Sequence, residues 1–123
     1  YTSAAGIRYV VDLSKPEGSR VEILSMSDGS AFDFDKDYKV AVNSYQASGG
    51  GNFVPVGLGW DKETLEAHTI DTTPIDVRRY VASYIREQGT ITPQLRGDWH
   101  IVPTELWEKA KAKEIESDNR SHR

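Results

Sequence analysis

One helical segment constrains the fold of this chain more than any other part. Residues 77–85 place apolar side chains at the i, i+3, i+4, i+7 and i+8 spacing of a single helix face. Thr73, a good N-cap, with Pro74 after it predicts the start of the helix, and Gly89 predicts its end. Such a helix must rest on a sheet or on another helix, so we assign its stripe to the core. The stripe consists of Val77, Tyr80, Val81, Tyr84 and Ile85.

Four segments have patterns typical of strands, and they are residues 7–13, 20–26, 38–45 and 99–102. The loop between the first two contains Pro16 and Gly18, so these strands should form a hairpin. A short helix should follow a cap at Asp61. From Thr104 onward an irregular helical pattern leads into dense charge, and we expect the last half dozen residues to be loose.

The totals set limits on the kind of protein this is. A chain of 123 residues has room for one core. Its net charge is −4 and its lysines and arginines do not gather, so we expect no nucleic-acid partner. The apolar stretches fall far short of the roughly 20 residues needed to cross a bilayer, so we expect no membrane span. The sequence opens at Tyr1 without a Met or an export signal, and we interpret it as a fragment.

Catalytic and metal-binding patterns are weak. Asp33, Asp35 and Asp37 alternate like the opening of a calcium loop, but Tyr38 and Ser44 occupy the places where that loop needs Gly and Glu. A solvated turn is the better interpretation. No cysteine, histidine cluster or Ser–His–Asp set is present, so we expect neither catalytic residues nor a metal site in this chain. The histidines should be surface or packing residues, and the tryptophans, which are Trp60, Trp99 and Trp107, could line a pocket but more commonly anchor the core.

The segment of residues 43–53 is the candidate binding site, because it leaves a predicted strand and continues into a Gly-rich loop. The ring of Tyr45 could stack on a nucleotide base, and the glycines would let the backbone approach a sugar or phosphate with free N–H donors. The alternative is a flexible turn beside an aromatic side chain packed into the core. The candidate ligand-binding residues are Tyr45, Ser48, Gly49, Gly50, Gly51 and Asn52.

The motif Tyr-x-Val-x-x-Asn-x-Tyr-x-Ala-x-Gly-Gly-x-x-Phe, at residues 38–53, resembles the 5'-nucleotidase C-terminal domain family. The Ala-Gly-Ile-Arg-Tyr segment at residues 5–9, Asp12, the helix from Ile75 and the strand from Trp99 to Pro103 agree with it. The resemblance implies an α+β fold, a mixed sheet with packed helices, that forms the rear portion of that domain. Residues 1–103 would be the partial nucleotide-binding domain, and residues 104–123 a C-terminal helix and charged tail.

The resemblance also implies partners. Family enzymes join such a domain to an N-terminal metallophosphoesterase domain, which holds two divalent metal ions and a catalytic His/Asp pair. We therefore expect no cofactor in this chain, a nucleotide or nucleoside as its ligand, the metallophosphoesterase domain in cis or in trans, and a periplasmic or secreted location. Tyr45 would be one of two aromatic walls around the base; the other wall, with the Asn and Arg that hold base and phosphate, would precede Tyr1.

One position departs from the family pattern. Many 5'-nucleotidases carry an Asp that binds the ribose hydroxyls where this chain has Gly51. With Tyr at position 45, this favours the branch that acts on 2',3'-cyclic and 3'-nucleotides. The leading hypothesis is a nucleotide-binding domain of a metal-dependent nucleotidase or 2',3'-cyclic-nucleotide phosphodiesterase in nucleotide catabolism, inactive by itself. The alternative is a noncatalytic ligand-binding or interaction module on the same scaffold.

Overall fold

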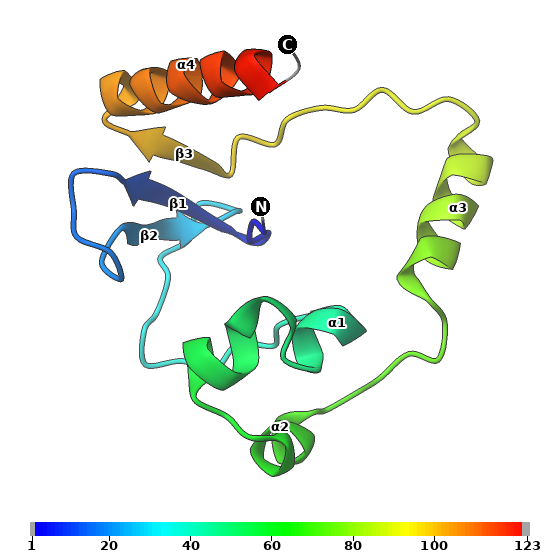
Figure 1. The fold of residues 1–123 in the computed structure, drawn as a ribbon. Helices are drawn as coiled ribbons and strands as arrows, with labels where there is room; N and C mark the ends of the chain where they lie inside the picture. Colours follow the sequence, from blue (N-terminus) through cyan, green and yellow to red (C-terminus); the bar gives the residue numbers. More distant parts are fainter. Residues whose placement is uncertain (1, 122–123) are drawn as a thin grey trace. The chain divides into compact units, whose positions relative to one another are not determined.

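The computed structural model of the chain describes residues 2–121, with side chains as far as Ser117. The chain divides into two compact units (Figure 1). The first unit combines Tyr1–Lys36 with Gln94–Arg123, and the second is Asp37–Pro93. Segments from both ends of the chain therefore build one unit, and its middle builds the other.

The first unit contains a three-stranded sheet followed by a helix. Its strands are β1 (Ile7–Asp12), β2 (Val21–Met26) and β3 (Trp99–Val102), and helix α4 is Thr104–Ser121. The strand order is β2-β1-β3, with β2 antiparallel and β3 parallel to β1. The predicted hairpin, the strand at residues 99–102 and the mixed sheet of an α+β fold are confirmed.

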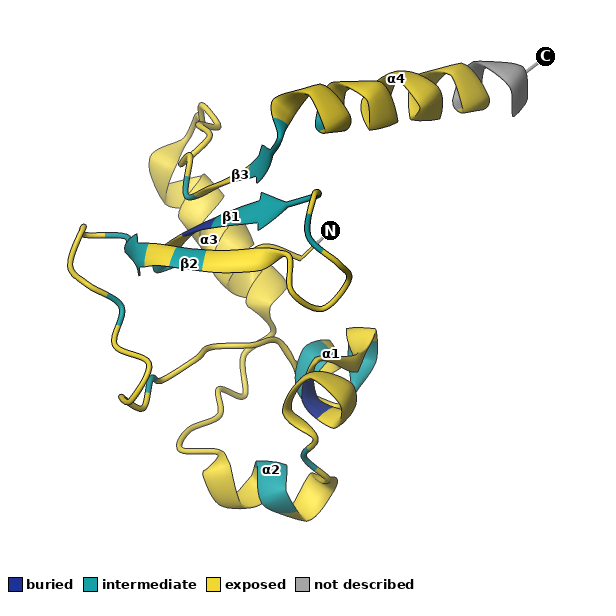
Figure 2. Cartoon of the chain, turned by 90° about the vertical axis from the view of Figure 1, so that its left-hand side faces the viewer, coloured by how far each residue is buried: buried dark blue, intermediate teal, exposed yellow. Residues whose placement is uncertain are grey.

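Tyr9 is the buried centre of this sheet. It lies opposite Ile23 of β2 and Trp99 of β3, next to an irregularity in the register between Arg8 and Tyr9. Figure 2 shows the buried position on β1. Its ring stacks on that of Trp99, with centroids 6.0 Å apart and planes 11° apart. Its hydroxyl accepts a hydrogen bond from the main-chain N–H of Ala4 at 3.2 Å. The ring is thus fixed on several sides.

Aspartates hold the turns that follow β1 and β2. Oδ1 of Asp12 accepts hydrogen bonds from the N–H of Ser14 at 2.9 Å and from its hydroxyl at 2.6 Å. Asp28 accepts the same two bonds from Ser30, at 2.9 Å and 2.6 Å. In both cases the hydroxyl bond, followed by the N–H bond, lowers the pKa of the carboxyl, because both bonds favour its ionised form.

The second unit consists of short helices. They are α1 (Ser44–Ala47), the 3-10 helix η1 (Gly50–Asn52), the π-helix η2 (Phe53–Leu58), α2 (Lys62–His68) and α3 (Val77–Gln88). The predicted strand at residues 38–45 is wrong. Residues 38–43 have no regular structure and α1 begins at Ser44, because the side chains of Asn43 and Gln46 cap a helical turn there.

Helix α2 confirms the predicted cap: Oδ1 of Asp61 accepts from the N–H of Thr64 at 2.8 Å. Helix α3 begins later than predicted. Its N-cap is Asp76, which accepts from the N–H of Arg78 at 2.8 Å, whereas Thr73 bonds to Ile75 ahead of the helix. Gly89 ends the helix as predicted, with its N–H donating to the carbonyl of Ile85.

The prediction that the stripe of α3 lies in the core is wrong for this structure. Tyr80 is 50% exposed and Tyr84 56%, and Val77, Val81 and Ile85 are exposed to a similar degree. The helix thus forms from its local signals, while its apolar face remains open over the described residues. Tyr80 makes one local contact, a hydrogen bond of 2.9 Å between its hydroxyl and that of Thr73.

Helix α4 confirms the predicted helix after Pro103, and the N–H of Leu106 in its first turn donates to the Pro103 carbonyl at 3.1 Å. The prediction of loose final residues is wrong for residues 118–121, because α4 continues to Ser121. Residues 122–123 of that prediction lie outside the described residues. None of the helices in the described part of the chain combines the length and apolar character that crossing a membrane requires.

Candidate nucleoside-binding loop

The candidate site is held in place by a capping box at its start. The N–H of Gln46 donates to Oδ1 of Asn43 at 2.8 Å, and the N–H of Asn43 donates to Oε1 of Gln46 at 3.3 Å. Two otherwise unpaired main-chain donors are satisfied in this way. The result is a single helical turn, α1, that carries the exposed Tyr45.

Left-handed backbone continues the loop. Gly49 has φ 99°, Gly51 has φ 70° and Asn52 has φ 61°. Glycine adopts this conformation without penalty, and asparagine tolerates it better than most residues. The chain can therefore reverse direction between α1 and η2 within a few residues. Val54, in the first turn of η2, is buried and anchors the far end (Figure 2).

The ring of Tyr45 lies directly on the backbone of Gly50. A Cβ added to Gly50 would be 2.5 Å from Cε1 and Cζ of Tyr45 and 2.6 Å from Cδ1, closer than real Cβ atoms approach other carbons. These nearly equal distances to three adjacent ring carbons place Gly50 over a face of the ring, because a point beyond the ring edge would be much nearer to one carbon. Tyr45 is nevertheless 69% exposed, so its other face is open.

The edge of a second aromatic ring approaches the next glycine. A Cβ added to Gly51 would be 2.8 Å from Cε2 of Phe53 and 3.0 Å from Cδ2. Phe53 is itself 44% exposed. The glycine run is therefore needed for two aromatic contacts as well as for backbone geometry. The sequence interpretation recognised the glycines but missed these contacts, and Phe53, which ends the motif, was the signal for them.

The main-chain N–H groups of the loop are less free than predicted. The N–H of Gly49 donates to the carbonyl of Gln46 at 3.2 Å, and the N–H of Asn52 donates to the carbonyl of Gly49 at 3.1 Å. The hydroxyl of Ser48 donates to the carbonyl of Tyr45 at 3.1 Å. The expectation of N–H donors facing a ligand therefore narrows to Gly50 and Gly51, while Asn52 keeps its side-chain amide for such a role.

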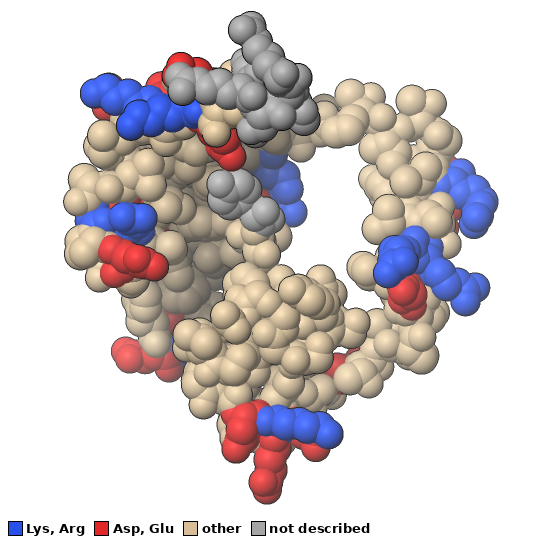
Figure 3. Space-filling model, viewed as in Figure 1, with Lys and Arg blue, Asp and Glu red and all other residues tan. Residues whose placement is uncertain are grey.

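The loop lies in an uncharged stretch. Residues 40–60 contain no Asp, Glu, Lys or Arg, although 28% of the whole chain is charged. On the face shown in Figure 3, uncharged residues cover the place that α1 occupies in Figure 1. Elsewhere on that face basic and acidic side chains lie next to one another. The site is therefore suited to a flat, neutral group such as a base, and it offers no cation to a phosphate.

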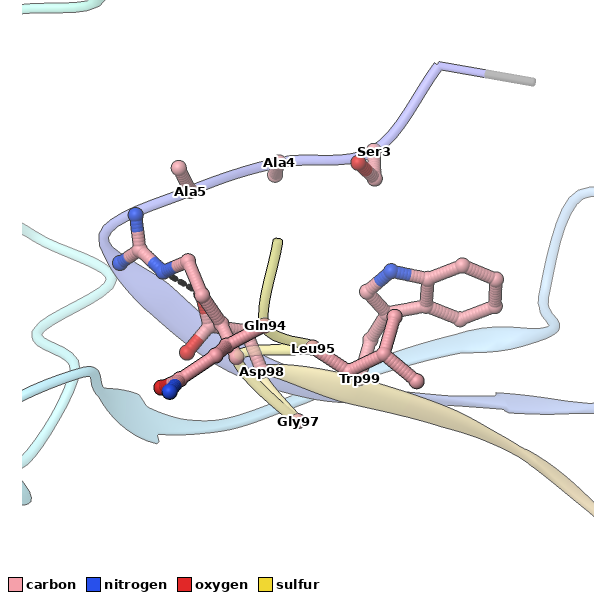
Figure 4. Close-up of a pocket in the computed structure, with 9 residues that line it drawn as sticks. Ser3, Ala4, Ala5, Gln94, Leu95, Gly97, Asp98 and Trp99 are labelled. Carbon is pink, nitrogen blue, oxygen red and sulfur yellow. Dashed lines mark ion pairs between the residues drawn. The ribbon is translucent and has the colours of Figure 1, made fainter. Parts of the chain in front are cut away.

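A separate hollow of about 480 Å³ lies in the first unit, between the segment before β1 and the segment before β3 (Figure 4). Trp99 contributes its indole ring to this hollow, and the same ring stacks on Tyr9, so Trp99 combines the two roles considered for the tryptophans. Arg96 and Asp98 form an ion pair of 2.8 Å on its wall. No residue of the glycine loop lines this hollow; the remaining lining residues are Ser3, Ala4, Ala5, Gln94, Leu95 and Gly97.

His68 and Asp33, two of the other residues considered in the sequence, make structural contacts. His68 packs its ring on Trp60 with centroids 4.4 Å apart, and its Nδ1 lies 2.8 Å from the carbonyl oxygen of Thr64. Asp33 accepts from the N–H of Asp35 at 3.0 Å, which fits the predicted turn. Across the described residues, no three His, Asp or Glu side chains gather in a way that could hold a metal ion. His122 lies outside the description.

Comparison with known proteins supplies the family context. A family described as "5'-nucleotidase, C-terminal domain" matches residues 1–56, which include the whole glycine loop. The Trifunctional nucleotide phosphoesterase protein YfkN of Bacillus subtilis is 30% identical over 110 residues, covering 80% of this chain. The chain spans only 7% of that relative's length. No solved structure matches the chain.

Proposed function

Because the chain belongs to the family of 5'-nucleotidase C-terminal domains, we propose that it binds the nucleoside part of a nucleotide for a phosphoesterase. The observation that carries the proposal is the ring of Tyr45, which has one face against Gly50 and the other open. An exposed aromatic face stacks on a base with a gain of about 1–3 kcal/mol. The match to a relative named as a nucleotide phosphoesterase supports the choice of ligand.

Each part of the loop has a role in this proposal. Tyr45 stacks on the base. Gly50 supports the inner face of that ring, and Gly51 and the side chain of Asn52, which follow in the chain, contact the sugar. Gly49 and Ser48 bond to α1 and keep the loop in its shape. The capping box then fixes the turn that carries the ring, which limits the entropy lost on binding.

Phosphate recognition and hydrolysis belong elsewhere in this proposal. The uncharged loop has no cation for a phosphate, and the described residues gather no donor set that fits the two divalent ions of the family. We therefore assign both tasks to a metallophosphoesterase domain joined in cis or docking in trans, and derive no metal-dependent step for this chain. A periplasmic or secreted location belongs to the same proposal, and fractionation of cells that express the gene tests it.

The finer part of the proposal concerns the ribose. At the place where many family members have Asp, Gly51 has a positive φ and the ring of Phe53 occupies the space of a side chain. A carboxylate there would strain the backbone and displace Phe53. Without it, the 2' and 3' oxygens of the ribose can carry a phosphate, and we propose 3'- and 2',3'-cyclic nucleotides as substrates of the whole enzyme.

Titration of the chain with AMP, 3'-AMP and adenosine, followed by NMR, tests the proposal. Binding should be weak, with a Kd of about 1 mM, because one aromatic wall contributes only part of the clamp. Tyr45→Ala should weaken it about 5- to 150-fold, which corresponds to the loss of the stack. Tyr84→Ala is the matched control, since Tyr84 is also exposed but lies on α3.

The three ligands separate the parts of the proposal. The uncharged loop predicts that AMP and adenosine bind about equally and with little dependence on salt. 3'-AMP should bind as well as AMP if the 3' oxygen is unhindered. If none of the ligands shifts the resonances of residues 43–53, the proposed function is wrong. If Tyr45→Ala and Tyr84→Ala weaken ligand binding equally, Tyr45 is not part of the binding site.

A further inference from the structure

We propose that Gly50 is a positioning residue for Tyr45 and that Tyr45 offers a ligand only one face of its ring. This inference rests on the proposed function and adds to it a residue and a direction of approach. The other face of the ring is covered by the backbone of Gly50 itself. The base must therefore stack on the face turned away from η1.

The distances explain why this position is a glycine. Gly50 has no positive φ, so its backbone conformation would accept another residue. The obstacle is the Tyr45 ring, whose three nearest carbons lie 2.5–2.6 Å from where a Cβ would be. By contrast, the two neighbours of Gly50, Gly49 and Gly51, are glycines with positive φ. The three consecutive glycines thus meet two different requirements.

The contact with Gly50 also holds the Tyr45 ring in place. The main-chain position of Tyr45 is set by α1, and its ring rests on η1, so the side chain bridges two short helices. A methyl group at position 50 would push the ring outward and toward the face that the ligand needs. Binding should then fall although no group that touches the ligand has been removed.

Gly57 offers a matched control for Gly50→Ala. It also lacks a positive φ, and its added Cβ would meet only the carbonyl oxygen of Asn52 at 3.8 Å, an ordinary contact. Gly57→Ala therefore adds the same methyl group to the next helix of the chain without touching Tyr45. AMP should bind to Gly57→Ala as to the unaltered chain, and at least about fivefold more weakly to Gly50→Ala.

Two further variants distinguish positioning from general damage. Tyr45→Phe keeps the ring and should keep most of the binding. In the double variant Gly50→Ala with Tyr45→Ala, the glycine substitution should add nothing to the loss caused by Tyr45→Ala, since it acts only through the ring. Additive losses, or AMP binding to Gly50→Ala at the original strength, would overturn the inference.

A spectroscopic signature decides the geometry without any ligand. The α-proton of Gly50 that points where a Cβ would be lies over the Tyr45 ring. It should be shifted upfield by the ring current, and this shift should vanish in Tyr45→Ala. An unshifted Gly50 signal contradicts the inference even if Gly50→Ala does not fold. If the Gly50 signal is shifted but the unaltered chain does not bind AMP, the ring placement is correct and the nucleoside-binding proposal is wrong.

Discussion

Tyr9 and Tyr45 illustrate two uses of one residue type. Tyr9 is 8% exposed, and it is enclosed by β2, β3 and the N–H of Ala4. Tyr45 is 69% exposed and has a neighbour on one ring face only. Both are motif tyrosines. The difference shows that motif membership does not distinguish a core tyrosine from an exposed tyrosine such as the one we propose for binding, whereas the number of covered ring faces does.

The backbone around each ring follows the same division. Around Tyr9 the hydrogen bonds join segments far apart in the sequence, including a bond from its own N–H to the carbonyl of Asp98 at 3.0 Å. Around Tyr45 they join residues within a few positions, such as Asn43 and Gln46. The sheet depends on burial for its stability, and the loop depends on local caps. Substitutions in the sheet should therefore change the stability of the fold, whereas substitutions in the loop should change local amide exchange and nucleotide binding.

The largest expected effect is the loss of stability in Tyr9→Ala. Removing a buried aromatic ring costs about 3–5 kcal/mol, so urea unfolding of the sheet should shift strongly or the unit should not fold. Tyr9→Phe, which loses only the bond from Ala4, should cost about 1 kcal/mol. Tyr45→Ala should change stability by less than about 0.5 kcal/mol. Equal destabilisation by Tyr9→Ala and Tyr45→Ala would contradict the difference drawn between the buried and the exposed tyrosine.

Asn43→Ala should have an intermediate effect confined to the loop. Loss of an N-cap costs about 1 kcal/mol, and here it also removes the partner of Gln46. The amides of Ala47 and Ser48 should exchange with solvent faster, and nucleotide binding should weaken because the turn that carries Tyr45 frays. Asn43→Asp retains the cap acceptor and is the control. Unchanged exchange in Asn43→Ala would show that the turn does not depend on its cap.

The smallest expected effect is acid sensitivity at the turns of the sheet, which the cap of α2 shares because hydrogen bonds with Thr64 also lower the pKa of Asp61. The pKa values of Asp12 and Asp28 lie below the usual 3.8 in the folded chain. Their stabilising contribution is therefore complete above about pH 3.8, the unfolded value, and is lost as the pH falls through their folded values. Asn43 and Gln46 have no charge to lose, so α1 should not respond.

Thermal unfolding of the unaltered chain and of the double variant Asp12→Asn with Asp28→Asn measures this effect. It is followed from about pH 5 to about pH 2, roughly the range over which carboxylates titrate. The stability of the double variant should depend less on pH. A sheet whose pH dependence is the same with and without the two carboxylates would contradict the assignment.

Much of the sheet could be predicted from the sequence. Period-two alternation identified β1, and apolar segments next to loops with Pro and Gly identified β2 and β3. The same rule failed at residues 38–45 because a capping box at Asn43 formed a helical turn instead. The parallel pairing of β3 with β1 could not be predicted from local pattern, since it joins Trp99 to Tyr9 across most of the chain.

The residues of the candidate loop could be singled out from the sequence, and their role as a site stays a prediction; their contacts could not be foreseen. The sequence identified Tyr45 and the glycines, yet the reason for Gly50 depends on the Tyr45 ring, which packs on it only once the loop has formed. The stripe of α3 was predicted as buried because amphipathic helices usually are, but burial requires a partner surface that periodicity cannot supply. The proposed boundary at residue 103 stays a prediction.

The most direct measurement of the central claim is an intermolecular NOE experiment on the chain with AMP. We expect NOEs from the H8 and H2 protons of the base to the ring protons of Tyr45, with no NOEs to the ring protons of Tyr9 or Tyr84. NOEs from the base to another aromatic ring, with none to Tyr45, would contradict it.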